Sequence, residues 1–356
     1  MSAITTLHKA KELKNDEFYT QLADVSNELM HYKTHFKNKT VLCNCNDSVW
    51  SAFWKYFHLN FAELGLKKLI STSYSKGEIA YKMEYTGGDD NDIEVCVKTP
   101  LEGNGDFRNL ECLDLLDECD IVVTNPAFSL FRPYMTTLME HQKKFIVWAN
   151  NNAITYKEFF PLLKDNKVWL GYTANKTLSF RIPDDYEKWD KIETAKINDG
   201  HHYAKVPAIS VFTNLDIAKR HEKLILREQY TPERYPKYSN YDAINVNKVS
   251  DIPNDYDGVM GVPITFLCNF NPDQFEILGY AGGVSWDNFN TIKTLKEYIG
   301  CKQHDFDGTI SNGSKINTGA ALCFDTVPAD RYYTASNCNG YLVRTYGRIL
   351  IQKRNV

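Results

Sequence analysis

The chain has 356 residues and a mass of 41.0 kDa, which is long enough for a catalytic domain and a smaller second domain. Its hydrophobic fraction of 43% and charged fraction of 24% are ordinary for a globular protein and exclude a disordered or collagen-like chain. A net charge of −4 and a pI near 6.2 exclude a protein that coats nucleic acid through a broadly basic surface.

Targeting signals and metal-binding motifs are also missing from the sequence. No apolar run reaches the roughly 18 residues of a membrane span, and the first residues lack the apolar stretch of a signal peptide, so we expect a cytoplasmic protein. Cys43 and Cys45 are too close together for a Cys-x-x-Cys knuckle, which predicts reduced thiols. His201 and His202 are adjacent in a predicted loop, and we expect no metal site.

Six short apolar runs predict buried strands, because each is continuously hydrophobic and rich in β-branched residues. In chain order they are residues 40–45, 68–73, 120–124, 145–150, 168–172 and 208–213. Helical spacing of apolar side chains lies between them, at 48–64 and at 130–141. This alternation predicts a doubly wound α/β domain with a mostly parallel sheet, whose ligands bind beyond the carboxyl ends of the strands.

The residues that follow the third predicted strand carry the clearest chemical signal. There a buried run leads directly into Asn125, Pro126 and, two positions later, Phe128. The exocyclic amine of adenine is a poor nucleophile because its lone pair is delocalised, so it needs acceptors that draw it toward tetrahedral geometry. The Asn125 side-chain oxygen and the Pro126 carbonyl can each accept one amine hydrogen. Phe128 can stack on the base, which offsets part of the cost of flipping it out of a duplex.

Asn-Pro also begins turns for purely conformational reasons, and only its position between a strand and a helix favours the chemical interpretation. The wider sequence resembles the EcoRI-type family of adenine-specific DNA methyltransferases. The similar segments include LHKAK, DEFYTQ, VLCNCND, GDFR, DIVVTNPAFSLFR, KKFIVWANNNAITYKE, YPKYSNYDAINVNK and YDGVMGVPITFLCNFNPDQFEIL. The resemblance weakens between about residues 282 and 337 and returns at NGYLVRTYGRILI.

The resemblance implies a class I S-adenosylmethionine-dependent methyltransferase fold and a restriction-modification function. Such an enzyme transfers a methyl group from S-adenosylmethionine to N6 of an adenine flipped out of a short specific site in double-stranded DNA. We expect it to act as a monomer without membrane contact. Enzymes of this type function alongside a cognate restriction endonuclease, and the sequence does not reveal whether one exists for this protein.

The same resemblance assigns the cofactor site to three segments. The matching residues are Phe18, Tyr19, Thr20, Asn44, Asn46, Asp47, Asp106 and Phe107. Thr20 would bond the donor's carboxylate, Asp106 its adenine amine, and Phe107 would lie beside that ring. Without the resemblance, Gly105-Asp106 is equally well explained as a turn. The acidic residue expected for the ribose hydroxyls is absent, because residues 71–74 are Ser, Thr, Ser and Tyr.

The order of the motifs resembles the gamma arrangement of amino methyltransferases, in which DNA recognition follows catalysis. We therefore predict a catalytic domain at 1–220 and a smaller target-recognition domain at 221–356. Candidate contacts with bases or phosphates are Tyr235, Lys237, Tyr241, Asn245, Asn247, Arg344 and Arg348. For any one of them, a surface position without a DNA role is the competing interpretation.

Ala127 departs from the family pattern, which usually has a second proline there. The change leaves both acceptors in place, so we expect reduced or near-normal activity. Two other functions remain open from the sequence: a catalytically weak or inactive relative that binds DNA, and a methyltransferase acting on RNA or a protein amide. An unrelated nucleotide-binding enzyme is disfavoured because neither GxxxxGK[ST] nor GxGxxG occurs.

Overall fold

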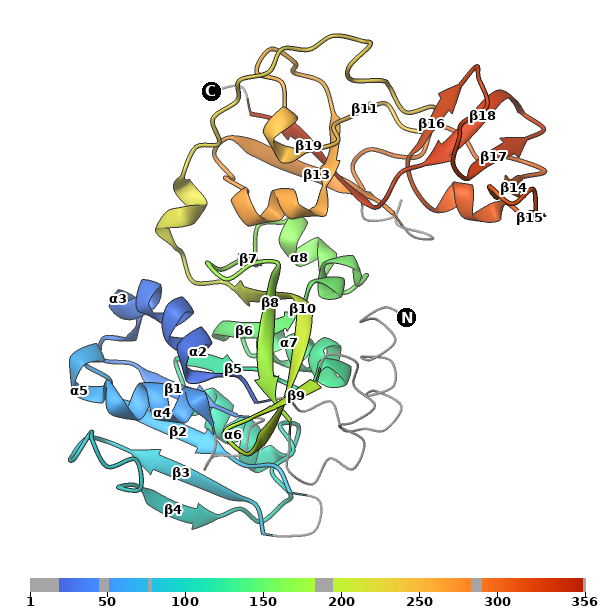
Figure 1. Cartoon of the computed structure of the whole chain (residues 1–356). Coiled ribbons are helices and arrows are strands. Elements are labelled where there is room, and N and C mark those ends of the chain that lie inside the picture. Colours follow the sequence, from blue (N-terminus) through green and yellow to red (C-terminus); the bar gives the residue numbers. More distant parts are fainter. Residues whose placement is uncertain (1–18, 45–50, 76–78, 183–194, 283–289, 355–356) are drawn as a thin grey trace. The chain divides into compact units, whose positions relative to one another are not determined.

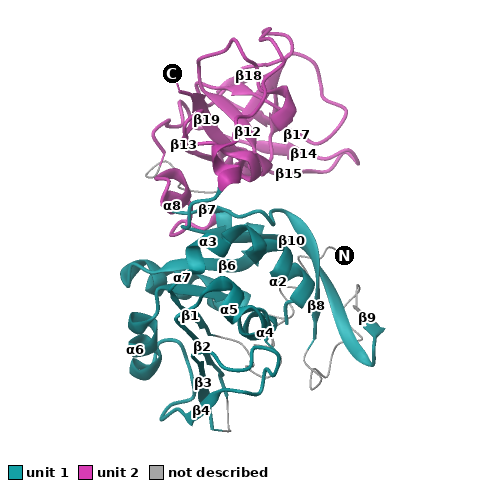
Figure 2. Cartoon of the chain, turned by 90° about the vertical axis from the view of Figure 1, so that its left-hand side faces the viewer, with its two compact units in different colours: residues 1–154, 168–217 teal, residues 155–167, 218–356 magenta. Residues whose placement is uncertain are grey.

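The computed structural model describes residues 19–44, 51–75, 79–182, 195–282 and 290–354 (Figure 1). The chain forms two compact units (Figure 2). Unit 1 consists of Met1–Ile154 and Val168–Ile217, and unit 2 of Thr155–Lys167 and Ala218–Val356. The short segment Thr155–Lys167 therefore packs with the second unit, although it lies within the range 1–220 that the sequence suggests for the first domain.

Unit 1 is built on a ten-stranded sheet in the order β4-β3-β2-β1-β5-β6-β10-β7, with β8 and β9 also paired to β10. The strands are β1 Thr40–Cys43, β2 Lys68–Thr72, β3 Tyr81–Tyr85, β4 Val97–Pro100, β5 Ile121–Thr124, β6 Lys144–Asn150, β7 Trp169–Leu170, β8 Lys176–Arg181, β9 Ala195–Asn198 and β10 His201–Thr213. The four central strands β2, β1, β5 and β6 run parallel, and the flanking pairs are antiparallel. The α/β class is confirmed, but the sheet is mixed, and the prediction of mostly parallel strands is right only for its centre.

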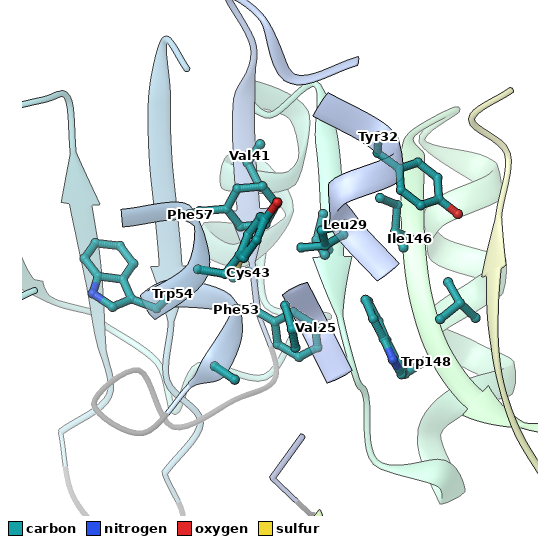
Figure 3. Packing of buried hydrophobic residues seen from close by; sticks show 14 of the residues in the cluster. Val25, Leu29, Tyr32, Val41, Cys43, Phe53, Trp54, Phe57, Ile146 and Trp148 are labelled. Atoms are coloured by element: carbon teal, nitrogen blue, oxygen red, sulfur yellow. The ribbon is translucent and has the colours of Figure 1, made fainter. Parts of the chain in front are cut away.

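Helices cover both faces of this sheet (Figure 2). They are α2 Leu22–Leu29, α3 Lys33–Phe36, α4 Ala52–Leu59, α5 Phe61–Leu64, α6 Leu110–Glu118 and α7 Phe131–Glu140, with single 3-10 turns η1 Met30–Tyr32, η2 Phe128–Leu130 and η3 Asn151–Thr155. Aromatic side chains of α4, among them Phe53 and Phe57, pack with Val25 and Leu29 of α2 against Trp148 of β6 (Figure 3). The three- and four-residue spacing in the sequence is thus the buried stripe of α4.

A buried carboxylate ties α2 to the turn after β7. Glu28 is fully buried and accepts hydrogen bonds from the Tyr32 hydroxyl at 2.7 Å, from the Tyr172 backbone N–H at 2.9 Å and from the Thr173 backbone N–H. Gly171 permits this approach, because a Cβ there would lie 2.2 Å from the Glu28 carboxylate. These bonds fix the helix that directly follows Tyr19 and Thr20.

Strand β10 is longer than the predicted run 208–213 and contains both histidines that the sequence suggested for a loop. It begins at His201, pairs first with β8 and β9, and pairs from Ile209 onward with β6. The register against β8 shifts between Val206 and Ile209, where Ala208 adopts φ +58°. The shift lets one strand serve both the central sheet and the β8–β9 extension.

Unit 2 contains two small sheets and a few short helices. One sheet has the order β11-β12-β19-β13 and the other β15-β14-β17-β18-β16. The strands are β11 Ile244–Asn245, β12 Met260–Pro263, β13 Phe275–Ala281, β14 Lys302–His304, β15 Ile310–Asn312, β16 Ala321–Phe324, β17 Tyr332–Ala335, β18 Cys338–Arg344 and β19 Arg348–Lys353. The helices are α8 Phe160–Lys164, η5 Ala218–His221, η6 Val249–Asp251, η7 Ile264–Asn269 and η8 Ser314–Thr318.

Helix α8 belongs to this unit because it packs on β13, with the rings of Phe160 and Tyr280 at 5.6 Å between centroids. None of the helices in the described part of the chain combines the length and the apolar run needed to cross a bilayer.

Candidate active site

The carboxyl ends of β1 and β5 lie side by side because the two strands pair in parallel, with Leu42 opposite Val122. Asn44 follows β1, and its carbonyl accepts a hydrogen bond from the Thr124 hydroxyl. Its side-chain oxygen accepts another from the hydroxyl of Tyr134, in the first turns of α7. Asn44 therefore joins the two strand ends to the helix that follows the Asn-Pro turn.

Asn125 is the first residue after β5 and is only 6% exposed. Its side-chain amide nitrogen donates a hydrogen bond to the Thr20 hydroxyl oxygen at 3.2 Å. Thr20 is also buried, and its neighbour Tyr19 pairs with Arg181 of β8 through two backbone bonds of 2.9 and 3.0 Å. Because the amide nitrogen faces Thr20, the Asn125 side-chain oxygen is directed to the other side of the amide.

The turn that follows holds the two remaining predicted catalytic residues. Pro126 and Ala127 are buried, and the Ala127 carbonyl accepts a bond of 2.8 Å from the Leu130 N–H. Phe128 is half-buried and meets Phe180 of β8 edge to face, with centroids 6.5 Å apart. One edge of its ring is thus held by unit 1 while part of the ring stays accessible, as a base-stacking role requires.

Proline at position 127 is expected to be tolerated. Ala127 has φ −48° and ψ 129°, which a proline ring adopts with little strain. We therefore expect Ala127→Pro to stabilise the fold by about 0.4–1 kcal/mol, through the lower entropy of the unfolded chain, and to change the methylation rate by less than about threefold. Urea unfolding and a methyl-transfer assay measure both quantities; a loss of stability would show that the alanine is needed for the backbone of this turn.

A glycine brings the Asp106 segment against the end of β2. Gly105 has φ +76°, and a Cβ there would lie 1.9 Å from the Ser73 carbonyl oxygen. The Ser75 N–H donates to the Asn104 carbonyl at 3.0 Å and closes the contact. Asp106 and Phe107 are thereby placed beside the carboxyl end of β2, where nucleotide-like ligands bind in open α/β sheets.

Asp106 is held as an ionised carboxylate. Hydrogen bonds from the Arg108 guanidinium, at 2.8 and 2.5 Å, are the main reason that its pKa lies below the usual value. Phe107 is buried and packs edge to face on Tyr134, with 5.0 Å between centroids. Through Tyr134 this segment contacts the Asn44 side chain, so the two segments predicted to bind the cofactor, after β1 and before α6, form one cluster.

The end of β2 carries two buried hydroxyls instead of an acid. Within the described ranges, neither the Ser71 Oγ nor the Thr72 Oγ1 has a hydrogen-bond partner. Buried polar atoms without partners are uncommon and are readily satisfied by a polar ligand. Because consecutive strand residues point to opposite faces of a sheet, one of these two hydroxyls can face a hydroxyl-bearing ligand at this strand end.

The predicted cofactor residues divide into two groups. Thr20, Asn44, Asp106 and Phe107 lie at one edge of the sheet, as described above, and Tyr19 adjoins them. Phe18, Asn46 and Asp47 lie outside the described residues. The sequence analysis did not identify Tyr134 or Phe180 as residues of this site. Tyr134 could have been identified from its position, because it lies one turn into the helix that follows the Asn-Pro turn.

Four of the seven predicted DNA contacts are buried in unit 2, namely Tyr235, Tyr241, Asn245 and Arg348. The Tyr235 hydroxyl donates to the Asp251 carbonyl at 2.7 Å, and Asn245 accepts bonds from Tyr238 and Arg348. These positions favour a structural role over contact with bases, because their polar atoms already bond within the unit. Lys237 and Asn247 are exposed and Arg344 is half-buried, so these three remain candidates.

No group of three His, Cys, Asp or Glu side chains within the described ranges is arranged to hold a metal ion. The site is instead an amide, a peptide carbonyl and an aromatic ring at the end of a parallel strand. On an α/β sheet, this arrangement defines an amino-methyltransferase class.

Comparison with known proteins identifies the family. The family described as "Adenine-specific methyltransferase EcoRI" matches residues 6–354. Type II methyltransferase M.EcoRI of Escherichia coli is 47% identical over 293 residues, which is 78% of this chain and 90% of that protein. Type II methyltransferase M.MgeORF184P of Mycoplasma genitalium is 40% identical, covering 86% of this chain and 95% of that protein. M.MpnI of Mycoplasma pneumoniae is 39% identical, covering 84% and 92%.

The chain therefore belongs to the EcoRI family of adenine-specific methyltransferases, as the sequence motifs predicted. No solved structure gives a significant match.

Proposed function

We propose that this protein transfers the methyl group of S-adenosylmethionine to N6 of an adenine flipped out of a short specific site in double-stranded DNA. It would be the modification enzyme of a type II restriction-modification system, acting as a monomer in the cytoplasm. The observation that carries the proposal is the Asn125 amide, anchored by Thr20 at the end of β5 in a chain of the adenine-specific family.

The reaction follows from the placement of two acceptors. The Asn125 side-chain oxygen and the Pro126 carbonyl each accept one hydrogen of the adenine amine, which leaves the nitrogen lone pair directed away from the ring. S-adenosylmethionine supplies an electrophilic methyl group on a sulfonium. With the donor bound, that methyl carbon would be the electrophile for the amine nitrogen, the sulfur would leave as a neutral thioether, and the extra amine proton would pass to water. Positioning alone drives the step, and no covalent enzyme intermediate is needed.

The donor is held by residues around the same strand ends. Asp106 is ionised at neutral pH and can accept the donor's adenine amine, and Phe107 lies beside it. A buried hydroxyl at the end of β2, that of Ser71 or of Thr72, is available for the ribose, in place of the usual acid. The Thr20 segment would take the methionine end. Unit 1 would thus be the catalytic domain of a class I methyltransferase fold, and unit 2 the target-recognition domain.

The bond between Thr20 and Asn125 gives a direct test of amide orientation. Thr20→Val keeps the shape of the side chain and removes its acceptor, so the amide is free to rotate away from the productive orientation. We expect kcat to fall by about fivefold, since one hydrogen bond of this kind contributes roughly 1 kcal/mol. Thr20→Ser keeps the oxygen and is expected to retain most of the activity; equal losses in both variants would contradict the assigned orientation.

The acceptor class is tested by offering three substrates to the purified protein. Tritiated S-adenosylmethionine is incubated with unmethylated duplex DNA, with RNA and with bacterial protein, and an Asn125→Ala variant serves as the inactive control. Label in DNA alone, lost in the variant, supports the proposal. Label in RNA or protein would assign the alternative acceptor, and DNA binding without transfer to any acceptor would identify an inactive relative.

A further inference from the structure

Two aromatic side chains in unit 2 stand almost fully in solvent. Tyr346 is 89% exposed in the turn between β18 and β19, and Phe306 is 88% exposed in the turn between β14 and β15. Single exposed apolar residues are common on protein surfaces and need no function. The surroundings of the two rings, however, differ in charge.

The turn that carries Tyr346 is anchored on both sides of the ring. The backbone N–H and the hydroxyl of Thr345 both donate to the Ala320 carbonyl, at 2.9 and 3.0 Å. On the other side, Gly347 packs so closely on Tyr280 that a Cβ would lie 2.2 Å from the Tyr280 hydroxyl. The ring therefore projects from a fixed backbone, and ordering it on a partner costs little entropy because tyrosine has only two side-chain torsions.

The charge around this turn suits a polyanion. Residues 341–356 contain Arg344, Arg348, Lys353 and Arg354 and no acid. Arg344, two residues before Tyr346, is half-buried and donates to the Thr318 carbonyl at 3.2 Å, so its cation is held in place next to the turn. Arg348 is buried against Asn245, and Lys353 and Arg354 lie at the other end of β19, so Arg344 is the cation that a ligand of this turn would meet. Fixed positive charge beside an exposed ring is the combination that binds nucleic acid through phosphates and bases together.

The Phe306 turn has the opposite character. It lies between Asp305 and Asp307, and hydrogen bonds from Gln303 and from Thr309, respectively, are the main reason that their pKa values lie below the usual range. Arg331 pairs with Asp305 and so compensates only one of the two carboxylates. This turn would repel a polyanion, and Phe306 provides a matched control of equal exposure.

We propose that Tyr346 is a DNA-contacting residue of this enzyme, whose ring stacks on a base that the flipped duplex leaves unstacked. The inference rests on the proposed DNA substrate. A duplex from which one nucleotide has been extruded exposes the faces of neighbouring bases, and an aromatic ring is a general partner for such a face.

Three variants test the assignment: Tyr346→Ala, Tyr346→Phe and Phe306→Ala. The probe is genomic DNA from a strain without adenine methylation, with tritiated S-adenosylmethionine as donor. We expect Tyr346→Ala to raise KM for DNA on the order of tenfold, because a stacked base is lost. Tyr346→Phe keeps the ring, and Phe306→Ala removes a ring that faces no DNA, so both should stay within about twofold of wild type. Donor affinity and Tm should be unchanged in all three.

A wild-type KM for DNA in Tyr346→Ala would overturn the inference while leaving the proposed function intact. An equal rise of KM in Phe306→Ala would also overturn it. That result would show that losing an exposed ring weakens DNA binding whether the ring lies beside a cation or between carboxylates. Failure of the wild-type protein to methylate DNA would instead refute the proposed function, and this inference with it.

Discussion

Replacing Asn125 with alanine is expected to lower kcat for methyl transfer by about 100- to 1,000-fold, with little change in affinity for S-adenosylmethionine. The loss is large because the acceptor acts mainly as the amine approaches tetrahedral geometry, in a buried setting where hydrogen bonds are strong. Single-turnover transfer at saturating DNA measures the rate, and calorimetric titration measures donor binding. The two readouts together separate a chemical role from a donor-binding role.

Two further variants complete this experiment. Asn125→Asp keeps oxygen acceptors but loses the amide donor to Thr20, so its rate should fall between those of wild type and alanine. Asn91→Ala changes an exposed asparagine in the β3–β4 connection and should stay within about twofold of wild type. An Asn125→Ala enzyme that retained a tenth or more of the wild-type rate would remove this residue from the chemistry.

Gly105→Ala is expected to weaken donor binding by about tenfold or more and to cost several kcal/mol of stability. The new Cβ would meet the Ser73 carbonyl, a backbone atom that cannot rotate away, so the segment with Asp106 must move. The backbone also has φ +76°, where a non-glycine residue adds about 1–2 kcal/mol. Calorimetric titration with S-adenosylmethionine and urea unfolding give the two numbers.

Gly200 provides the matched control for this substitution. It has the same φ of +76°, but nothing lies within 4 Å of a Cβ built there. Gly200→Ala should therefore show only the backbone cost of about 1–2 kcal/mol and normal donor affinity. If the two alanine variants bound the donor equally well, contact between Gly105 and β2 would have no part in forming the cofactor site.

The centre of unit 1 could be predicted because its strands are buried on both faces. β1, β5 and β6 appear in the sequence as continuous apolar runs, and the Asn-Pro turn follows one of them directly. β4 gave no such signal, since all four of its residues are exposed and the last is proline. The first half of β10 alternates in burial and is followed by Pro207 and Ala208, so the sequence suggested a loop there.

The structure of unit 2 was harder to predict from the sequence, for a different reason. Part of its core is a hydrogen-bonded polar cluster, in which Asn245 accepts bonds from Tyr238 and Arg348. Asparagine, tyrosine and arginine side chains also form hydrogen bonds with nucleic-acid bases. Composition alone therefore cannot distinguish a buried hydrogen-bond network from a DNA-contacting surface. Its strands are also short, between two and seven residues, which leaves little periodicity to detect.

The most direct test of the acceptor pair at residues 125 and 126 is modified-base sequencing of genomic DNA from cells that express the protein. We predict N6-methyladenine at one position of a single short sequence, and its absence from cells that express the Asn125→Ala variant. Unmodified adenine throughout the genome, or methylation that persists in the variant, would contradict the proposed mechanism.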